Sequence, residues 1–191
     1  MGRILVSEFT TLDGVIGVPT FTVAYPFTEA MGKAMSAITA EGSEAILFGR
    51  TTWVESAPAW TSRDMADDPG APFFNNTPKH VVSSTLTDVS SWPGSSVLGD
   101  YDMDRLQQLK DSVATGIYCY GSGTLVRAML ADGLVDELHL FVYPIALGTG
   151  PKLFPEGTPE TTLTLAGAES FENGVVHLTY GPTAEPSASL R

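Results

Sequence analysis

Three short segments of the chain carry residues that could bind phosphate groups. They are Gly49-Arg50-Thr51-Thr52, Ser83-Ser84 and Gly121-Ser122-Gly123-Thr124. Each follows a strand-like apolar run, and the first and third open into helical patterns. Free N–H groups and the positive dipole end of a helix start attract anions, and hydroxyls and Arg50 add further donors. We therefore interpret these segments as candidate phosphate-binding strand ends.

The position of the three segments favours a larger ligand. In an α/β sheet, ligands bind beyond the carboxyl ends of the strands. A dinucleotide with two backbone phosphates and a ribose phosphate would use all three segments. The alternative is that serine and threonine are common caps, and that the glycine turn at Gly121 is a tight turn that binds nothing. The convergence of the three segments favours the dinucleotide.

Other known site patterns are missing from the sequence. The third glycine of a Rossmann fingerprint would fall at Val126, and no Gly-Lys-Ser/Thr of a Walker A loop follows Gly121. A single cysteine, Cys119, excludes an internal disulfide and the cytidine-deaminase zinc signature. His80, His139 and His177 lack metal-ligand spacing, so we interpret them as structural and expect no metal.

Two carboxylates are candidate catalytic groups. Glu29 stands at a predicted helix start and could be a proton donor, or it could simply be a favourable charge at the helix N-terminus. Asp13 precedes Gly14, where it is most often a plain turn residue.

Composition limits the partners. The 191 residues carry 22 Asp and Glu against ten Lys and Arg, a formal net charge of −12. Such a surface repels nucleic acid and anionic membrane, so we expect neither as a partner. The sequence contains no apolar run of the roughly 20 residues that span a bilayer, and it opens without a cleavable-signal pattern. A reducing cytoplasm is the expected compartment.

Strands and helices alternate up to about residue 133, and strands alone follow. The pattern predicts an α/β fold, with a mainly parallel sheet finished by antiparallel strands. We expect one domain over 1–181 and a flexible tail over 182–191. The predicted strands are 3–9, 45–48, 80–84, 97–98, 117–120, 137–143, 163–171 and 175–180. The predicted helices are 29–40, one beginning near 49, 102–112 and 124–130. Residues 56–78, rich in Pro, Asp and Asn, are expected to form a functional or interface loop that carries Trp60, Phe73 and Phe74.

A family resemblance rests on five ordered motifs. They are VSEFTTLDG (6–14), LFGRTTW (47–53), PKHVVSSTL (78–86), GSGTLVR (121–127) and LVDEL (134–138), followed by Tyr143-Pro144, Leu147-Gly148, Gly150 and Leu153-Phe154. Across residues 3 to 180 the chain resembles the dihydrofolate reductase-like superfamily, and within it the reductase (RibD C-terminal) domain of bacterial riboflavin biosynthesis. The resemblance implies a three-layer α/β/α sandwich and a homodimer.

The resemblance also implies an NADPH-dependent reductase. Arg50 and Ser83-Ser84 would hold the adenosine 2′-phosphate, while Thr51-Thr52 and the Gly121 turn would hold the pyrophosphate. The 13–17 segment would be the loop that closes over the nicotinamide. The cofactor-binding residues so implied are Gly14, Ile16, Gly49, Arg50, Thr51, Thr52, Ser83, Ser84, Gly121, Ser122, Gly123, Thr124 and Leu125.

The substrate side departs from the family pattern. The carboxylate of the first long helix corresponds to Glu29, but with different spacing, and the supporting threonine of a late strand falls at Phe141. The arginine for a glutamate tail maps near Thr77, with Lys79 close by. For a substrate phosphate the sequence offers Arg127, Arg63 and Lys152.

Three hypotheses result. The chain is an NADPH-dependent reductase of a small heterocyclic or carbonyl compound. Alternatively, it is a catalytically silent NADP(H)-binding protein that acts as a sensor or interaction partner. The third hypothesis is an oligomeric scaffold, supported only by the aromatic 56–78 segment.

Overall fold

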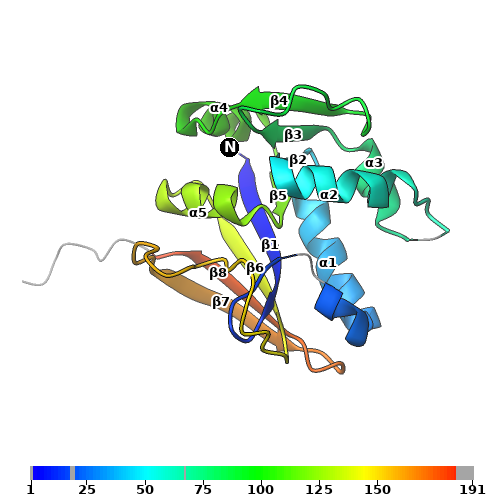
Figure 1. Ribbon diagram of the computed structural model, residues 1–191, viewed down its shortest axis with the longest axis vertical. Helices are drawn as coiled ribbons and strands as arrows, with labels where there is room; N and C mark the ends of the chain where they lie inside the picture. Colours follow the sequence, from blue (N-terminus) through cyan, green and yellow to red (C-terminus); the bar gives the residue numbers. More distant parts are fainter. Residues whose placement is uncertain (1, 18–19, 67, 184–191) are drawn as a thin grey trace, which may run out of the picture.

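A computed structural model describes residues 2–17, 20–66 and 68–183. Its eight-stranded sheet has the order β4-β3-β2-β5-β1-β6-β8-β7 (Figure 1). The strands are β1 (Arg3–Thr11), β2 (Ala45–Gly49), β3 (Lys79–Val82), β4 (Ser95–Gly99), β5 (Gly116–Tyr120), β6 (Glu137–Tyr143), β7 (Leu163–Ser170) and β8 (Val176–Pro182). Every neighbouring pair from β4 to β6 is parallel, and β8 is antiparallel to both β6 and β7. The predicted parallel sheet with an antiparallel C-terminal hairpin is confirmed.

Helices cover both faces of the sheet. Those in the described residues are η1 (Thr20–Ala24), α1 (Glu29–Glu41), α2 (Arg50–Thr61), α3 (Ala71–Asn76), α4 (Met103–Ser112) and α5 (Gly123–Ala131). Helices α1, α2 and α3 pack on one face and α4 and α5 on the other (Figure 1). The predicted three-layer arrangement is therefore confirmed.

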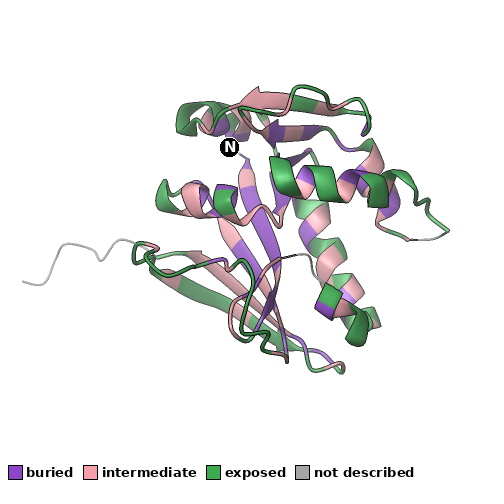
Figure 2. Ribbon diagram, in the orientation of Figure 1, coloured by how far each residue is buried: buried purple, intermediate pink, exposed green. Residues whose placement is uncertain are grey.

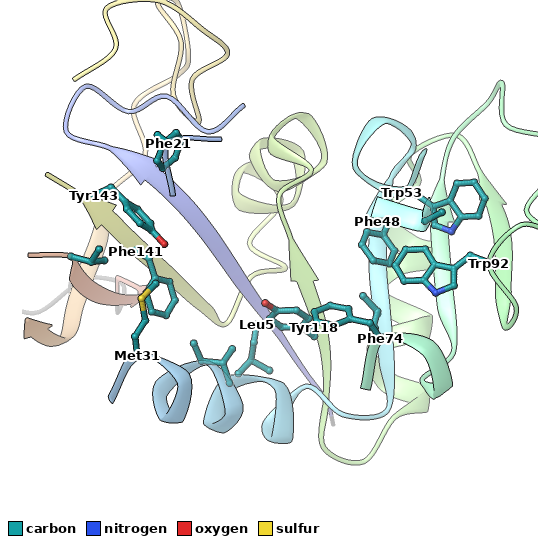
Figure 3. Close-up of a cluster of buried hydrophobic side chains, with 14 of the residues drawn as sticks. Leu5, Phe21, Met31, Phe48, Trp53, Phe74, Trp92, Tyr118, Phe141 and Tyr143 are labelled. Carbon is teal, nitrogen blue, oxygen red and sulfur yellow. The ribbon is translucent and has the colours of Figure 1, made fainter. Parts of the chain in front are cut away.

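Each face of the sheet has its own apolar core. On the α1–α3 face the core includes Met31, Trp53 and Phe74 (Figure 3), and on the α4–α5 face it includes Leu106 and Val126. Strand β2 is buried along nearly its whole length, as expected of a strand that is covered on both faces. Strand β7 is mostly exposed, which Figure 2 shows at the edge of the sheet.

Local signals set the helix ends. Thr28 caps α1 by accepting a hydrogen bond from the Met31 N–H at 3.1 Å, as its side-chain type predicts. Helix α5 is followed by Gly133 at φ 69°, a left-handed conformation that glycine adopts without strain. Strand and helix ends therefore fall within a few residues of the predicted positions.

The prediction that residues 56–78 form a loop is wrong. Helix α2 continues to Thr61 with Pro58 inside it, and α3 occupies much of the remainder. The Trp60 ring stacks on the Phe74 ring at 3.9 Å, so these aromatic side chains belong to the core layer and not to an open interface. The segment's Pro, Asp and Asn content suggested a loop, but burial of aromatic side chains outweighs the one backbone hydrogen bond that Pro58 removes.

Two further expectations concern the chain ends and membranes. The predicted flexible tail lies outside the described residues from residue 184 onward. No helix in the described part of the chain combines the length and the apolar character that a membrane crossing requires.

Candidate functional site

The sheet order places the three phosphate-binding candidates side by side. Strands β3, β2 and β5 are consecutive neighbours, and all three are parallel, so their carboxyl ends meet at one edge. The register pairs Gly49 with Val82. Arg50 and Ser83, which follow these two residues, therefore leave the sheet as neighbours.

Two of the segments are joined directly. The Gly49 N–H donates to Ser122 Oγ at 2.9 Å, and the Ser122 N–H donates to Thr52 Oγ1 at 2.8 Å. Ser122 Oγ in turn donates to the Tyr120 carbonyl at 3.3 Å. Ser122 has φ 61°, a left-handed conformation that is uncommon for a residue other than glycine, and it occurs where the two strand ends are tied together.

Both helix starts at this edge remain available to a ligand. Neither α2 nor α5 receives a side-chain cap at its N-terminus. Their first-turn N–H groups have no intrahelical partner, because the carbonyl four residues earlier in the chain lies outside the helix. The edge thus presents two sets of donors and two positive dipole ends, an arrangement that suits an anion with two phosphate groups.

The glycines of the β5–α5 turn make room for the protein's own side chains. A Cβ on Gly121 would lie 3.0 Å from Thr52 Cγ2, and a Cβ on Gly123 would clash with Ile16 Cδ1. Ile16 belongs to the 12–17 segment, which therefore lies against the start of α5. The two glycines therefore allow this close packing without a ligand, and Gly121 also has a φ of 55° that other residues rarely adopt.

Asp13 fastens the 12–17 segment. Its carboxylate accepts hydrogen bonds from Thr11 Oγ1 at 2.5 Å, the Gly148 N–H at 2.7 Å and the Leu147 N–H at 3.2 Å. These donors, that of Thr11 foremost, lower the pKa of Asp13 to about 2. The carboxylate stays ionised near neutral pH, so it has the role of a loop anchor and cannot donate a proton there.

Glu29 lies away from these contacts. Its side chain is 84% exposed at the first position of α1 and pairs with Lys33 Nζ at 2.6 Å, one helical turn along. Glu29 therefore has the surroundings expected of a carboxylate that stabilises a helix N-terminus by its charge.

The residues proposed to bind a ribose phosphate differ in how far their side chains are already hydrogen-bonded within the protein. Arg50 is exposed and makes no hydrogen bond or ion pair with the described residues. Ser83 Oγ accepts from the N–H groups of Thr85 at 3.2 Å and Leu86 at 3.0 Å, and it also lies 3.5 Å from Thr85 Oγ1, a contact in which either hydroxyl can be the donor. Ser84 beside it is exposed.

The other basic candidates are engaged within the protein. Arg127 donates to the carbonyls of Lys152 and Leu153 and to Thr124 Oγ1. Arg63 lies over the Trp60 ring at 5.0 Å. Lys79 is fully buried, and its ammonium donates to the carbonyls of Phe74 at 2.9 Å, Asn75 at 3.2 Å and Thr77 at 2.7 Å. Lys79 therefore anchors the end of α3 and does not reach a ligand.

Two residues of the edge were missed by sequence reasoning. In the described part of the chain, two buried side-chain oxygens have no hydrogen-bond partner, Glu8 Oε1 and the Tyr143 hydroxyl. Both residues lie near the carboxyl ends of adjacent parallel strands, β1 and β6, where the register pairs Glu8 with Leu140 and Thr11 with Tyr143. Buried polar groups are nearly always paired, so each unpaired oxygen is a candidate contact for a ligand. The two oxygens lie on opposite faces of the sheet, because Tyr143 belongs to the core on the α1–α3 face and Glu8 follows Ile4 and Val6 onto the α4–α5 face.

Burial changes the ionisation of both groups. It raises the pKa of Glu8 to about 8, against a smaller opposite effect of the Arg127 charge. It also raises the pKa of Tyr143, whose ring lies between Phe21 and Phe141 in Figure 3 and within 5.7 Å of the Phe9 and Tyr25 ring centroids. One sequence signal could have identified Glu8, since it is the only carboxylate in β1 and follows the apolar run Ile4 to Val6.

A histidine pair and a surface hollow lie elsewhere. His139 Nδ1 and His177 Nε2 are 3.0 Å apart on β6 and β8, and burial lowers the pKa of both. The described residues contain no group of three His, Cys, Asp or Glu side chains arranged to hold a metal ion. A hollow of about 340 Å³ lies between α5 and residues 154–161, away from the strand ends.

Comparison with known proteins identifies related chains. The model of the RibD C-terminal domain family matches residues 3–177. The uncharacterized protein YyaP of Bacillus subtilis (strain 168) is 25% identical over 188 residues, covering 93% of this chain and 94% of YyaP. A second Bacillus subtilis protein, YwjB, is 35% identical over 68 residues, 36% of this chain and 39% of YwjB.

Solved structures share the fold. A putative riboflavin biosynthesis protein from Shewanella sp. PV-4 superposes with a TM-score of 0.75 at 21% identity, covering 96% of this chain and 100% of that one. A pyrimidine reductase-like protein from Corynebacterium diphtheriae gives 0.63 at 15% identity, covering 96% and 93%. A diaminohydroxyphosphoribosylaminopyrimidine deaminase/5-amino-6-(5-phosphoribosylamino)uracil reductase from Thermotoga maritima gives 0.65 at 14% identity, covering 95% of this chain but 57% of that longer one.

Proposed function

The chain belongs to the RibD C-terminal domain family, and on that premise we propose that it is an NADPH-dependent reductase of a small heterocyclic compound related to pyrimidines or pterins, or of a carbonyl compound. The observation that carries the proposal is the edge formed by β2, β3 and β5, where two uncapped helix starts stand beside Arg50. The family, and structural neighbours that are described as reductases or reductase-like proteins, support a reductase.

The residues at this edge suit NADPH. The first-turn N–H groups of α2 and α5 would hold the diphosphate, and Arg50 with the hydroxyls of Ser83 and Ser84 would hold the 2′-phosphate. When bound, NADPH supplies a hydride to an electron-poor C=N or C=O bond.

The chain's own share in the reaction is orientation and exclusion of water. Ile16 packs against Gly123, and the Asp13 carboxylate fastens the same loop to Leu147 and Gly148. These contacts hold the 12–17 segment over the edge. The unpaired hydroxyl of Tyr143 is a donor that a substrate acceptor could use.

A binding experiment tests the cofactor. Arg50→Ala should weaken NADPH binding by about 10- to 100-fold, the value of a charge-assisted phosphate contact, and leave NADH binding nearly unchanged. Arg63→Ala, which removes the same charge just beyond the other end of α2, is the matched control and should change neither affinity. An equal loss of affinity for NADPH and NADH, or no binding of either by the unaltered protein, would contradict the cofactor assignment.

A second function is favoured by one observation. Asp13 is held ionised and Glu29 is exposed and paired with Lys33, so neither is placed as a proton donor. This favours the alternative of a catalytically silent NADP(H)-binding protein. Oxidation of NADPH in the presence of pterins, pyrimidines or quinoid carbonyls would support the reductase, and tight NADPH binding without oxidation by any of them would support the silent binder.

A further inference from the structure

Glu8 occupies an unusual place for a carboxyl group. Its side chain is 2% exposed on β1, and Oε1 has no hydrogen-bond partner among the described residues. Side chains alternate along a strand, and Ile4 and Val6 belong to the core on the α4–α5 face. Glu8 therefore points to that same face.

The sheet register brings Glu8 beside the turn that opens α5. Strands β1 and β5 pair up to Ser7 and Tyr120, and the Gly121 N–H donates to the Ser7 carbonyl at 3.3 Å. Glu8 is the next residue of β1, so its carboxyl group lies under the start of α5. This is the helix start to which the proposed function assigns a diphosphate.

The surroundings offer Glu8 no full counter-charge. From α5, Arg127 is near enough to favour the ionised form, but its guanidinium donates to two carbonyls and to Thr124. From β5 the ionisable neighbours are Cys119 and Tyr118, whose pKa values are both raised by burial, and from β6 the register partner is Leu140. Burial is thus the main influence, and it raises the pKa of Glu8 to about 8.

We propose that Glu8 controls how dinucleotide binding depends on pH. The Glu8 carboxyl group keeps its proton while a diphosphate occupies the start of α5, and it weakens binding when it ionises. The inference rests on the proposed function. Two negative groups in this buried region repel strongly, because the low local dielectric screens them little. Binding to the ionised form therefore takes up one proton from solvent onto the Glu8 carboxylate, and no covalent bond changes.

The expected result is a pH-dependent affinity for NADP⁺. Its dissociation constant should be nearly constant from pH about 7 to about 8 and then rise by up to tenfold per pH unit above about 8. Working above pH about 7 avoids the second ionisation of a phosphate monoester, which lies near 6. Calorimetry at about pH 8.5, in two buffers with different ionisation enthalpies, should show proton uptake on binding.

Glu8→Gln supplies the critical comparison. The amide has the same shape but cannot ionise, so the affinity should become independent of pH over this range and the proton uptake should vanish. Glu55→Gln, an acid-to-amide change at an exposed position of α2, is the matched control and should behave like the unaltered protein. Burial also lowers the pKa of Lys79 to about 8, and the Glu8→Gln comparison separates the two groups.

The outcomes distinguish this inference from the function on which it rests. NADP⁺ binding with no pH dependence, or a dependence that Glu8→Gln retains, overturns the role of Glu8 and leaves the cofactor assignment intact. No NADP⁺ binding at any pH overturns both. If Glu8→Gln fails to fold, carbon-13 NMR of the Glu8 carboxyl carbon in the unaltered protein decides, because its titration midpoint should move to higher pH when NADP⁺ is added, and an unmoved midpoint overturns the proposal.

Discussion

At the scale of single residues, the two unpaired oxygens of Tyr143 and Glu8 are the least expected feature. A buried polar group without a partner costs about 1–3 kcal/mol of stability. They lie toward the carboxyl ends of the neighbouring strands β6 and β1, on opposite faces of the sheet. Their cost to folding is understandable if a ligand completes their hydrogen bonds.

Tyr143→Phe tests whether the unpaired Tyr143 hydroxyl donates to a substrate. Because the hydroxyl is unpaired, its removal should leave the free energy of unfolding unchanged or raise it by up to about 1 kcal/mol. Reductase turnover should fall if the substrate accepts a hydrogen bond from the hydroxyl. Denaturant unfolding and a turnover assay measure the two effects.

The comparison is Tyr25→Phe, in the same aromatic cluster. Tyr25 donates to the Pro144 carbonyl at 3.3 Å, so that variant should lose about 0.5–1.5 kcal/mol. A loss of similar size in Tyr143→Phe would mean that its hydroxyl has a partner after all.

Glu8 also predicts a pH dependence of stability. Its folded-state pKa of about 8 lies above the ordinary 4.5, so its contribution to stability is fully present below about pH 4.5 and is lost as pH rises through about 8. Glu8→Gln has no such loss. The difference in unfolding free energy should therefore move in favour of the variant between about pH 5 and pH 8, by about 1.4 kcal/mol for each pKa unit of the shift. Thermal unfolding across this range measures it, and a constant difference would contradict the burial of an ionisable Glu8.

At the scale of elements, the join between α3 and β3 depends on one side chain. The ammonium of Lys79 donates to three carbonyls of residues 74–77 and lies 5.1 Å from the Trp92 ring centroid. The last carbonyls of a helix have no intrahelical donors, so a buried lysine can satisfy them. The strand that leads into Ser83-Ser84 is positioned in part by this anchor.

Lys79→Met keeps a side chain of similar length and removes the ammonium donors. It should destabilise the protein by about 2–4 kcal/mol, because several buried carbonyls lose their partners. Lys33→Met, on the exposed face of α1, should change stability by less than about 0.5 kcal/mol. Denaturant unfolding compares the two variants, and equal effects would rule out the anchor.

At the scale of the whole molecule, the net charge of −12 sets the long-range electrostatics. Like charges on a compact surface repel one another and also slow the approach of an anionic dinucleotide. The two helix starts and Arg50 counter this repulsion only locally. The proposed binding of a dinucleotide at the edge would therefore depend on short-range donors and not on the overall field.

Salt should consequently stabilise the fold. Raising sodium chloride from about 20 mM to about 200 mM at neutral pH shortens the Debye length to below about 10 Å and screens the self-repulsion. The melting temperature should rise by a few degrees. Thermal unfolding at the two salt concentrations measures this, and a fall would show that paired charges outweigh the net repulsion.

Local patterns in the sequence are enough to locate most of the helices and strands and the three phosphate-binding candidates. Apolar runs, the Thr28 cap and Gly133 are local signals, and local signals set where strands and helices begin and end. The same locality explains the error over 56–78, since the composition around Pro58 resembles a loop while the burial of Trp60 depends on α3.

Which of these segments meet depends on how the distant strands pair in the sheet. The order β3-β2-β5 brings Gly49, Thr52 and Ser122 into one hydrogen-bonded group, although more than 70 residues separate Gly49 from Ser122. It also decided that Glu8 is buried, that Asp13 is an anchor and that Glu29 is exposed. Pairing between distant strands and the exclusion of water are long-range properties, so the environment that sets the chemistry of a side chain exists only once the sheet has formed.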